Sequence, residues 1–283
     1  MTLSLTLEQL IEQTSDMVSL PQVSMRINEM VNSGDYKTAD VGKLISQDAG
    51  LTVRLLKIAN SPFYGLSKEV ETVSRAVTIL GSQQLRSLVL ATSSIKAFED
   101  MPNDLVSMQN FWFHNISCGL AAKFLSEKIS GIDSESMFTA GLLHDIGQLV
   151  IFKLLSEIGK QAILMTEEDP EEPELYEAER KLLGYDHADV GIELLKQWNL
   201  PVLFQECAGF HHDIEKASEY PREVAIVHIA NSIAVMAELN SMEDEHPAIN
   251  ERAWGISGLD ESIIESTMKD VQEQVHSVQG MLM

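Results

Sequence analysis

Apolar residues recur at helical spacing along the first hundred residues, where glycine, proline and capping residues separate short segments. The segment 51–61 is the clearest case, because four apolar side chains share one helical face. They are Leu51, Leu55, Ile58 and Ala59. Asp40 is placed to cap the preceding helix and Gly50 to end it, while Gly81 follows the helical segment 72–80. The pattern predicts a string of short helices.

The second half of the chain carries longer apolar segments at helical spacing. They occupy residues 112–129, 137–159, 185–198, 224–239 and 263–278. A pair of ionisable residues, His144 and Asp145, interrupts the segment 137–152, whose sequence MFTAGLLHDIGQLVIF is otherwise apolar. No segment alternates like a strand over a useful length, and no unit of roughly 20–50 residues repeats. The pattern predicts an all-α fold with a frayed C-terminal end.

Length and composition narrow the class of protein. The 283 residues are 45% hydrophobic, which suffices for one large core or two modest ones. No run approaches the roughly 20 apolar residues of a membrane span. The first residues lack the basic start and cleavage site of a secretory signal, and two cysteines, Cys118 and Cys207, suggest no disulfide framework. We therefore expect a cytoplasmic protein that does not enter a membrane.

Charge is both strongly negative and unevenly distributed. The net charge of -23 disfavours nucleic acid as the main ligand, because like charges repel. Four basic residues of the first half offer a weak alternative, although ordinary solvated positions explain them more simply: Arg54, Lys57, Arg75 and Arg86. Residues 1–105 contain nine Lys or Arg and twelve Asp or Glu, and the remainder contains 11 and 31. We expect an N-terminal helical subdomain (1–105), a helical core (106–240) and an acidic C-terminal helical tail (241–283).

Histidine and carboxylate side chains fall in the helical segments of the second half. The candidates are His114, His144, Asp145, His187, His211 and His212. Ionisable groups on a buried helix cost free energy unless something binds them. Imidazole and carboxylate together suit iron, manganese, zinc or nickel better than calcium. The spacing is too wide for a local motif, so only tertiary packing can assemble a site, and each histidine taken alone is equally compatible with a structural role.

Three segments of the chain resemble a known family. They are QDAGLTVRLLKIANSPFYG at 47–65, TVSRAVTILGSQQLRSLVL at 72–90 and GLLHDIGQLVI at 141–151. Together they resemble the HDOD family, the HD-related output domain of bacterial signalling proteins, over residues 15–240. The resemblance implies an HD-like helical core with an N-terminal helical subdomain, a role in signal transduction, and usually no demonstrated hydrolase activity.

The resemblance also implies a set of metal ligands. His114 matches the first histidine of the wider HD superfamily of phosphohydrolases, and His144-Asp145 matches its doublet. The histidines at 187, 211 and 212 match those of the HD-GYP phosphodiesterase branch. The position of the final HD aspartate is Asn231, whose amide oxygen can coordinate a cation but brings no charge. The implied cofactor is one or two divalent transition metal ions, Fe, Mn, Ni or Zn, held by His114, His144, Asp145, His187, His211, His212 and Asn231.

Other positions depart from the catalytic pattern. Gln148 stands where HD-GYP proteins carry a lysine, and Asn110 stands where they carry a glutamate. The segment 218–221, SEYP, lacks the glycine of their GYP signature. If catalysis survives, the resemblance implies phosphoester hydrolysis by water that the metal activates, with Asp145 bridging the metals or orienting the water. Lys153 and its few basic neighbours offer little charge for a phosphate.

Two functions are therefore carried forward. The first is a non-catalytic HDOD signalling module that acts through protein partners, keeps a metal site and is a candidate for self-association. The alternative is a metal-dependent phosphohydrolase acting on a nucleotide or cyclic dinucleotide, which the six retained candidate ligands favour.

Overall fold

The computed structural model describes residues 5–60, 69–98, 106–167, 174–240 and 248–283, and every regular element in these ranges is a helix. The α-helices are α1 (Leu7–Met17), α2 (Gln22–Ser33), α3 (Thr38–Ile45), α4 (Ala49–Ala59), α5 (Val73–Ala97), α6 (Met108–Ser126), α7 (Ser134–Leu143), α8 (Ile146–Leu154), α9 (Ser156–Glu167), α10 (Leu175–Leu183), α11 (His187–Gln197), α12 (Val202–Phe210), α13 (Pro221–Leu239), α14 (Glu251–Ser257) and α15 (Ile264–Leu282). Two short 3-10 helices are Ile214–Lys216 and Glu261–Ile263.

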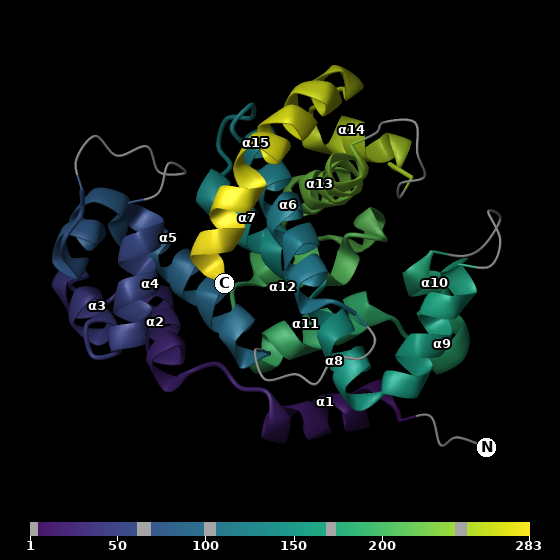
Figure 1. Cartoon of the computed structure of the whole chain (residues 1–283), viewed down its shortest axis with the longest axis horizontal. Helices are drawn as coiled ribbons and strands as arrows, with labels where there is room; N and C mark the ends of the chain where they lie inside the picture. The colour runs from purple at the N-terminus through teal and green to yellow at the C-terminus, as the bar shows by residue number, and fades with distance from the viewer. Residues whose placement is uncertain (1–4, 61–68, 99–105, 168–173, 241–247) are drawn as a thin grey trace.

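Helices α2 to α5 gather at one side of the molecule (Figure 1). Asp48 begins α4, because its side chain accepts a hydrogen bond from the Leu51 amide. The expected capping by Asp40 and the expected stop at Gly50 are therefore wrong: Asp40 lies in the first turn of α3 and Gly50 lies inside α4. Gly81 does separate two helical segments, since its backbone (φ 84°, ψ 161°) kinks α5.

Helices α6 and α7 form the centre of the molecule and pack backbone against backbone (Figure 1). A Cβ atom on Gly119 of α6 would lie 2.7 Å from the Phe138 carbonyl oxygen, and one on Gly141 of α7 would lie 2.8 Å from the Cys118 carbonyl oxygen. Only glycine permits this approach. The pair thereby brings the middle of α6 close to the end of α7.

The His144-Asp145 doublet lies in a turn between two helices. The continuous helix expected over 137–159 is wrong, because α7 ends at Leu143 and α8 begins at Ile146. Immediately after the doublet, Gly147 packs against the start of α11: a Cβ atom there would lie 2.0 Å from the His187 carbonyl oxygen. The break and this close contact together direct the doublet toward α11.

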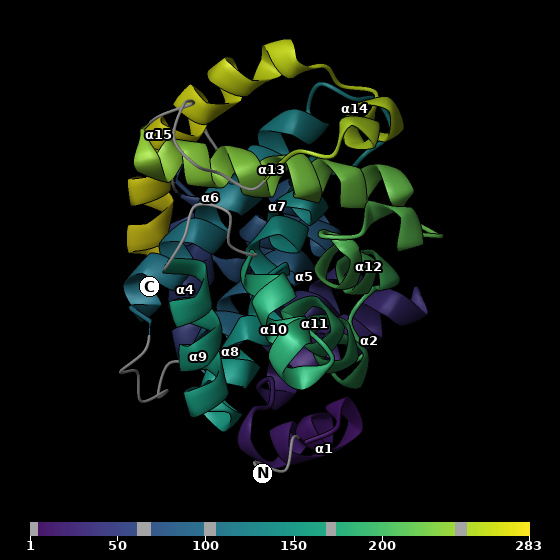
Figure 2. The same cartoon turned by 90° about the vertical axis from the view of Figure 1, so that its right-hand side faces the viewer.

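The last helices cover the central pair from the other side. Helix α13 packs on α6, and α15 crosses α6 to reach α4 (Figure 2). The buried face of α15 is mostly apolar, with Thr267 as a polar member, and ends at Leu282. Its apolar members include Val271, Val275, Val278 and Leu282. The expectation of a frayed end is wrong, since these residues gain burial against α6.

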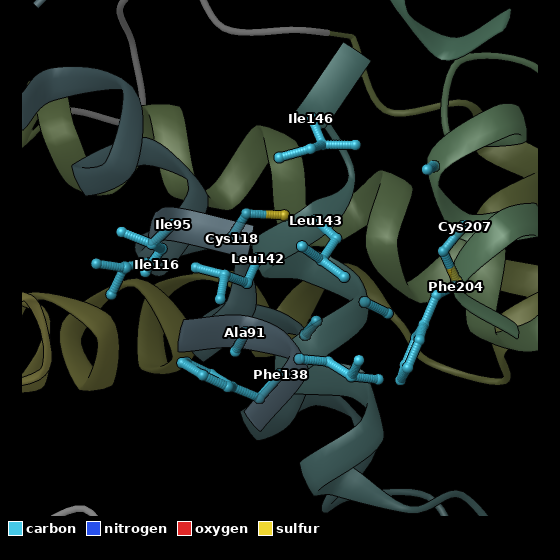
Figure 3. Packing of buried hydrophobic residues seen from close by; sticks show 14 of the residues in the cluster. Ala91, Ile95, Ile116, Cys118, Phe138, Leu142, Leu143, Ile146, Phe204 and Cys207 are labelled. Atoms are coloured by element: carbon cyan, nitrogen blue, oxygen red, sulfur yellow. The ribbon is translucent and has the colours of Figure 1, made fainter. Parts of the chain in front are cut away.

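One hydrophobic core runs through the described residues, from Leu10 to Leu282. Figure 3 shows its central part, to which Ile95 of α5, Ile116 of α6, Phe138 of α7 and Phe204 of α12 contribute side chains. The stretch Ser134–Leu154 is long and apolar enough to cross a membrane by composition, but 83% of its apolar window is buried inside the molecule, as in a core helix.

The expected domain borders fall at the edges of residues that the structure does not describe. One lies at residues 99–105 and the other at 241–247, which also include His246. The division into three units remains a prediction. Within the described part, α1 packs against α8 and α11.

Candidate metal centre

The predicted ligands come from five parts of the chain that the fold brings together. His114 lies on α6 and His144-Asp145 follows α7. The other residues lie on or next to the three helices α11, α12 and α13. They are His187 as the first residue of α11, His211 and His212 directly after α12, and Asn231 on α13.

Asp145 stands at the middle of this cluster and divides it into two groups. Its Oδ2 atom lies 3.4 Å from His144 Nε2 and 3.7 Å from His114 Nε2. Its Oδ1 atom lies 3.3 Å from His187 Nε2 and 3.4 Å from His211 Nε2. One carboxylate thus faces two pairs of imidazoles.

His212 completes the second group. Its Nε2 atom lies 2.9 Å from His187 Nε2, and its ring stacks on Tyr176 with the centroids 4.1 Å apart. The first group is His114, His144 and Asp145, and the second is Asp145, His187, His211 and His212. In each group, one potential ligand atom from every residue lies within 4.8 Å of those of the others. Asp145 belongs to both groups, so the cluster can supply ligands to two neighbouring cations.

Four imidazoles are held by the nitrogen that faces away from Asp145. His144 Nδ1 lies 2.7 Å from the Gly141 carbonyl oxygen, and His211 Nδ1 lies 2.9 Å from the Ala208 carbonyl oxygen. A carbonyl oxygen can only accept, so both rings carry their proton on Nδ1 and direct the Nε2 lone pair toward Asp145. This is the orientation that metal-ligating histidines require.

Carboxylates hold the other two rings in the same way. His114 Nδ1 lies 2.9 Å from Glu238 Oε1, and His187 Nδ1 lies 2.7 Å from Glu179 Oε2. Glu179 also accepts the backbone N–H of His187 at 2.8 Å. Each group therefore contains one histidine backed by a carbonyl and one backed by a carboxylate.

Buried polar atoms without partners test whether a cation fits. Within the part of the chain that the structure describes, His144 Nε2, His211 Nε2 and Asp145 Oδ1 make no hydrogen bond, although all three are buried. Such groups normally carry a partner, because burial without one costs about 1–3 kcal/mol each. Lone pairs converging from imidazole and carboxylate fit a divalent transition metal ion.

The electrostatics of the cluster favour a neutral His144 imidazole beside an ionised Asp145. Burial lowers the pKa of His144 to about 3. Burial by itself raises the pKa of Asp145, but the surrounding imidazoles of His144, His187 and His211 outweigh it and bring that pKa well below its usual value. Both shifts leave these groups in the protonation state that binds metal.

His187 and His212, two histidines of the second group, have pKa shifts in opposite directions. Burial lowers the pKa of His187, yet Glu179 and Asp145 outweigh it and raise that pKa well above its ordinary value. The pKa of His212 is well below its usual value, because of burial and the neighbouring imidazoles His211 and His187. His212 is therefore the neutral partner in the contact between the two rings.

Asn231 lies at the edge of the cluster. Its side chain is within hydrogen-bonding reach of the His114 ring, and it is 8% exposed. It lines a cavity of about 310 Å³ beside the centre, together with Glu174, Tyr176, His212, His228, Ala248, Ile249 and Asn250. Among these lining residues there is no lysine or arginine, and Glu174 contributes a carboxylate.

Three residues of the site escaped the sequence reasoning. Glu179 and Glu238 are two among 43 acidic residues, and no local pattern distinguishes them. His228 lies three residues before Asn231; its Nε2 atom accepts the Asn250 N–H, and its Nδ1 atom donates to the His211 carbonyl. The sequence offered one indication of His228, its position on an otherwise apolar helix. In the structure this side chain connects α13 to the backbone of His211 and Asn250, and it is not among the candidate ligands.

The fold and the cluster together define a class of protein: an all-helical domain of HD type with a buried His/Asp centre able to hold metal. The chain matches the family model described as HDOD domain over residues 17–214 and belongs to this family. The resemblance seen in the sequence is confirmed, and the all-α fold with it.

Known proteins share this fold over nearly the whole chain. An HDOD domain protein of Geobacter sulfurreducens is 24% identical with a TM-score of 0.79, covering 97% of each chain. A candidate phosphohydrolase of Shewanella amazonensis SB2B is 24% identical with a TM-score of 0.77, covering 97% of this chain and 98% of its own. A candidate signal transduction protein of Marinobacter aquaeolei VT8 is 18% identical with a TM-score of 0.76, covering 96% and 61%.

A curated relative is longer than this chain. It is an uncharacterised protein of Treponema pallidum (strain Nichols), 27% identical over 226 residues. The match covers 78% of this chain and 42% of that protein. The chain therefore corresponds to less than half of its relative's length.

Proposed function

We propose that this chain is a bacterial HDOD signalling module whose His/Asp centre holds divalent transition metal, and that it acts by contact with protein partners without hydrolysing phosphoesters. The observation that carries the proposal is the lining of the cavity beside the centre. A phosphate there would face the Glu174 carboxylate and no cationic side chain of the lining. Phosphoryl transfer depends on positive charge around the transferred group.

Arg180, which contacts the lining residue Tyr176, does not change this balance. Arg180 lies over the Tyr176 ring at 5.0 Å. Its Nε atom is 2.6 Å from Asp186 Oδ2, so its charge is already paired with a buried carboxylate. Arg180 thus packs beside the stack of Tyr176 on His212, and among the described residues that line the cavity none is a lysine or arginine.

The residues that would hold metal are those of the two groups around Asp145: His114 and His144 in the first, and His187, His211 and His212 in the second. A divalent ion there would act as a Lewis acid and would activate water. Asp145 belongs to both groups, so it could bridge two ions, as in two-metal hydrolases. This feature favours the alternative function, a metal-dependent phosphohydrolase acting on a nucleotide or cyclic dinucleotide. A candidate phosphohydrolase with the same fold keeps that alternative open to test.

One experiment separates the two functions. The purified chain is analysed for bound metal by elemental analysis, reconstituted with manganese or iron, and assayed on nucleotides, cyclic dinucleotides and a chromogenic phosphodiester. His144→Ala and Asp145→Ala serve as controls that remove ligands. We expect bound metal in the wild type, less in both variants, and no turnover above theirs. Turnover that disappears in the variants would establish the hydrolase, and absence of bound metal would remove the metal site.

The partners are proposed to be signalling proteins, including a second copy of this chain. Light scattering after size-exclusion chromatography measures self-association directly.

Cys118 and Cys207 are buried free thiols, which suits the reducing cytoplasm in which we place the protein.

A further inference from the structure

Glu238 lies directly behind the metal centre on the helix that carries Asn231. The two residues are seven positions apart on α13, close to two helical turns, so their side chains leave the same face. Both reach the His114 ring: Glu238 Oε1 lies 2.9 Å from Nδ1, and Asn231 is within hydrogen-bonding reach. His114 therefore links the centre to one neutral amide and one carboxylate.

The charges around the centre are unevenly supplied. Among the seven predicted ligands, Asp145 is the one carboxylate, and its two oxygens face different groups. Two divalent ions would bring four positive charges to a buried place that holds a single negative one. Buried charge of this size requires nearby compensation.

Two carboxylates outside the ligand set stand where compensation is needed. Glu179 binds His187 of the second group, and Glu238 binds His114 of the first. A carboxylate that accepts the Nδ1 proton of a histidine fixes the ring and increases the basicity of Nε2. Glu179 is fully buried and also accepts a backbone N–H, whereas the Glu238 side chain is 27% exposed and its ion pair with His114 is the one that it makes among the described residues.

We propose that Glu238 is a positioning residue that supplies, through His114, the negative charge that Asn231 does not bring to the first group. This inference rests on the proposed metal site. It gives Glu238 a role in metal affinity that is separate from stability of the fold. It also predicts that a carboxylate at position 231 makes Glu238 dispensable.

The test is a double-mutant cycle on metal affinity in the full chain. Manganese or zinc is titrated into metal-free protein, and binding is followed by calorimetry for the wild type, Glu238→Gln, Asn231→Asp and the double variant. Glu238→Gln is expected to weaken binding about 10–100-fold. Asn231→Asp is expected to bring the double variant back to within about threefold of the wild type, because the two sites are coupled.

A matched control removes the same charge elsewhere. Glu273→Gln lies at an exposed position of α15 and is expected to leave metal affinity unchanged. The unfolding midpoint of metal-free Glu238→Gln is measured in parallel. A purely structural role would lower that midpoint and would not be rescued by Asn231→Asp, which would overturn the inference.

The outcomes separate this inference from the proposed function. A wild type that binds no metal contradicts the proposed function. A wild type that binds metal with the same affinity as Glu238→Gln contradicts the inference alone. Should Glu238→Gln not fold alone, the comparison of Asn231→Asp with the double variant decides the question. A double variant that binds metal much more weakly than Asn231→Asp would show that a carboxylate at position 231 does not replace Glu238, and would overturn the inference.

Discussion

The buried carboxylate of Glu206 holds the loop before α13 by hydrogen bonds. It accepts hydrogen bonds from the backbone N–H groups of Ser218 at 3.2 Å, Glu219 at 3.1 Å and Tyr220 at 2.8 Å. These donors precede the first turn of α13, the helix that carries Asn231. One side chain therefore holds the loop that leads into one wall of the candidate site.

Replacing Glu206 by glutamine is expected to lower the free energy of unfolding by about 1–3 kcal/mol at neutral pH, because the backbone N–H groups of Ser218, Glu219 and Tyr220 lose their charged acceptor. Burial raises the pKa of Glu206, but the hydrogen bonds from Tyr220, Glu219 and Ser218 outweigh it and lower the pKa overall. The stabilisation is thus complete above the unfolded pKa and is lost as pH falls through the lower folded value.

Urea unfolding of wild type and Glu206→Gln at a series of pH values measures this difference, which should shrink in acid. Glu219→Gln is the matched control, since it changes an exposed neighbour in the same loop. A difference that stays constant down to the acid limit would show that the Glu206 charge is not responsible.

At this scale the sequence predicts the centre of the site better than its surroundings. The order of the histidines and the doublet indicated His114, His144, Asp145, His187, His211 and His212, and the structure brings all six together. Glu179 and Glu238 could not be predicted, because their roles come from tertiary contacts across eight and 124 residues. Whether Asn231 binds a metal remains a prediction.

Among the helices, close backbone contacts decide where the ligands lie. Gly147 of α8 packs on the start of α11, and Gly119 and Gly141 join α6 to α7. The apolar pattern predicted most of these helices but not the break between α7 and α8. Both doublet residues fit helical periodicity, so their placement in a turn depends on contact with α11, which no local pattern encodes.

Gly147→Ala is expected to destabilise the protein by about 1–3 kcal/mol and to weaken metal binding, because the new Cβ would displace His187. Gly280→Ala is the control: no atom lies within 4 Å of a Cβ there, and alanine should stabilise α15 by roughly 0.5–1 kcal/mol. Chemical unfolding and metal titration of both variants measure the two effects. Equal stabilities would show that α8 and α11 can separate without loss.

In the whole molecule, the candidate centre joins elements from the middle of the chain to its last third. Its residues belong to α6, the turn after α7, α11, α12 and α13. A cation bound by them would act as a crosslink that the unfolded chain lacks. Metal should therefore contribute to the stability of the whole core rather than to one helix.

Removal of metal by a chelator is expected to lower the unfolding midpoint. At free metal of about 100 times the dissociation constant, the stabilisation is about 2.7 kcal/mol, equivalent to about 5 °C for a chain of this size. Differential scanning calorimetry with and without metal measures the shift. Asp145→Ala should show almost none, and an equal shift in that variant would place the metal elsewhere.

The all-α architecture was predictable because helical periodicity is local. The course of α15 was not: its apolar face was evident, but its contacts with α6 and α4 depend on residues that lie far earlier in the chain. The charge asymmetry between the two halves says nothing about these contacts, because one apolar core connects them.

The sharing of Asp145 has a consequence for partly loaded protein. An ion in one group neutralises the single negative charge of Asp145 that both groups share, and places two positive charges a few ångströms from the other group. The second ion should therefore bind more weakly. A titration is expected to show two separated steps, and a single step with two equivalent ions would contradict this. When metal is limiting, the protein would then hold mainly one ion. Its occupancy would change over a wider range of free metal concentration than the occupancy of a single site.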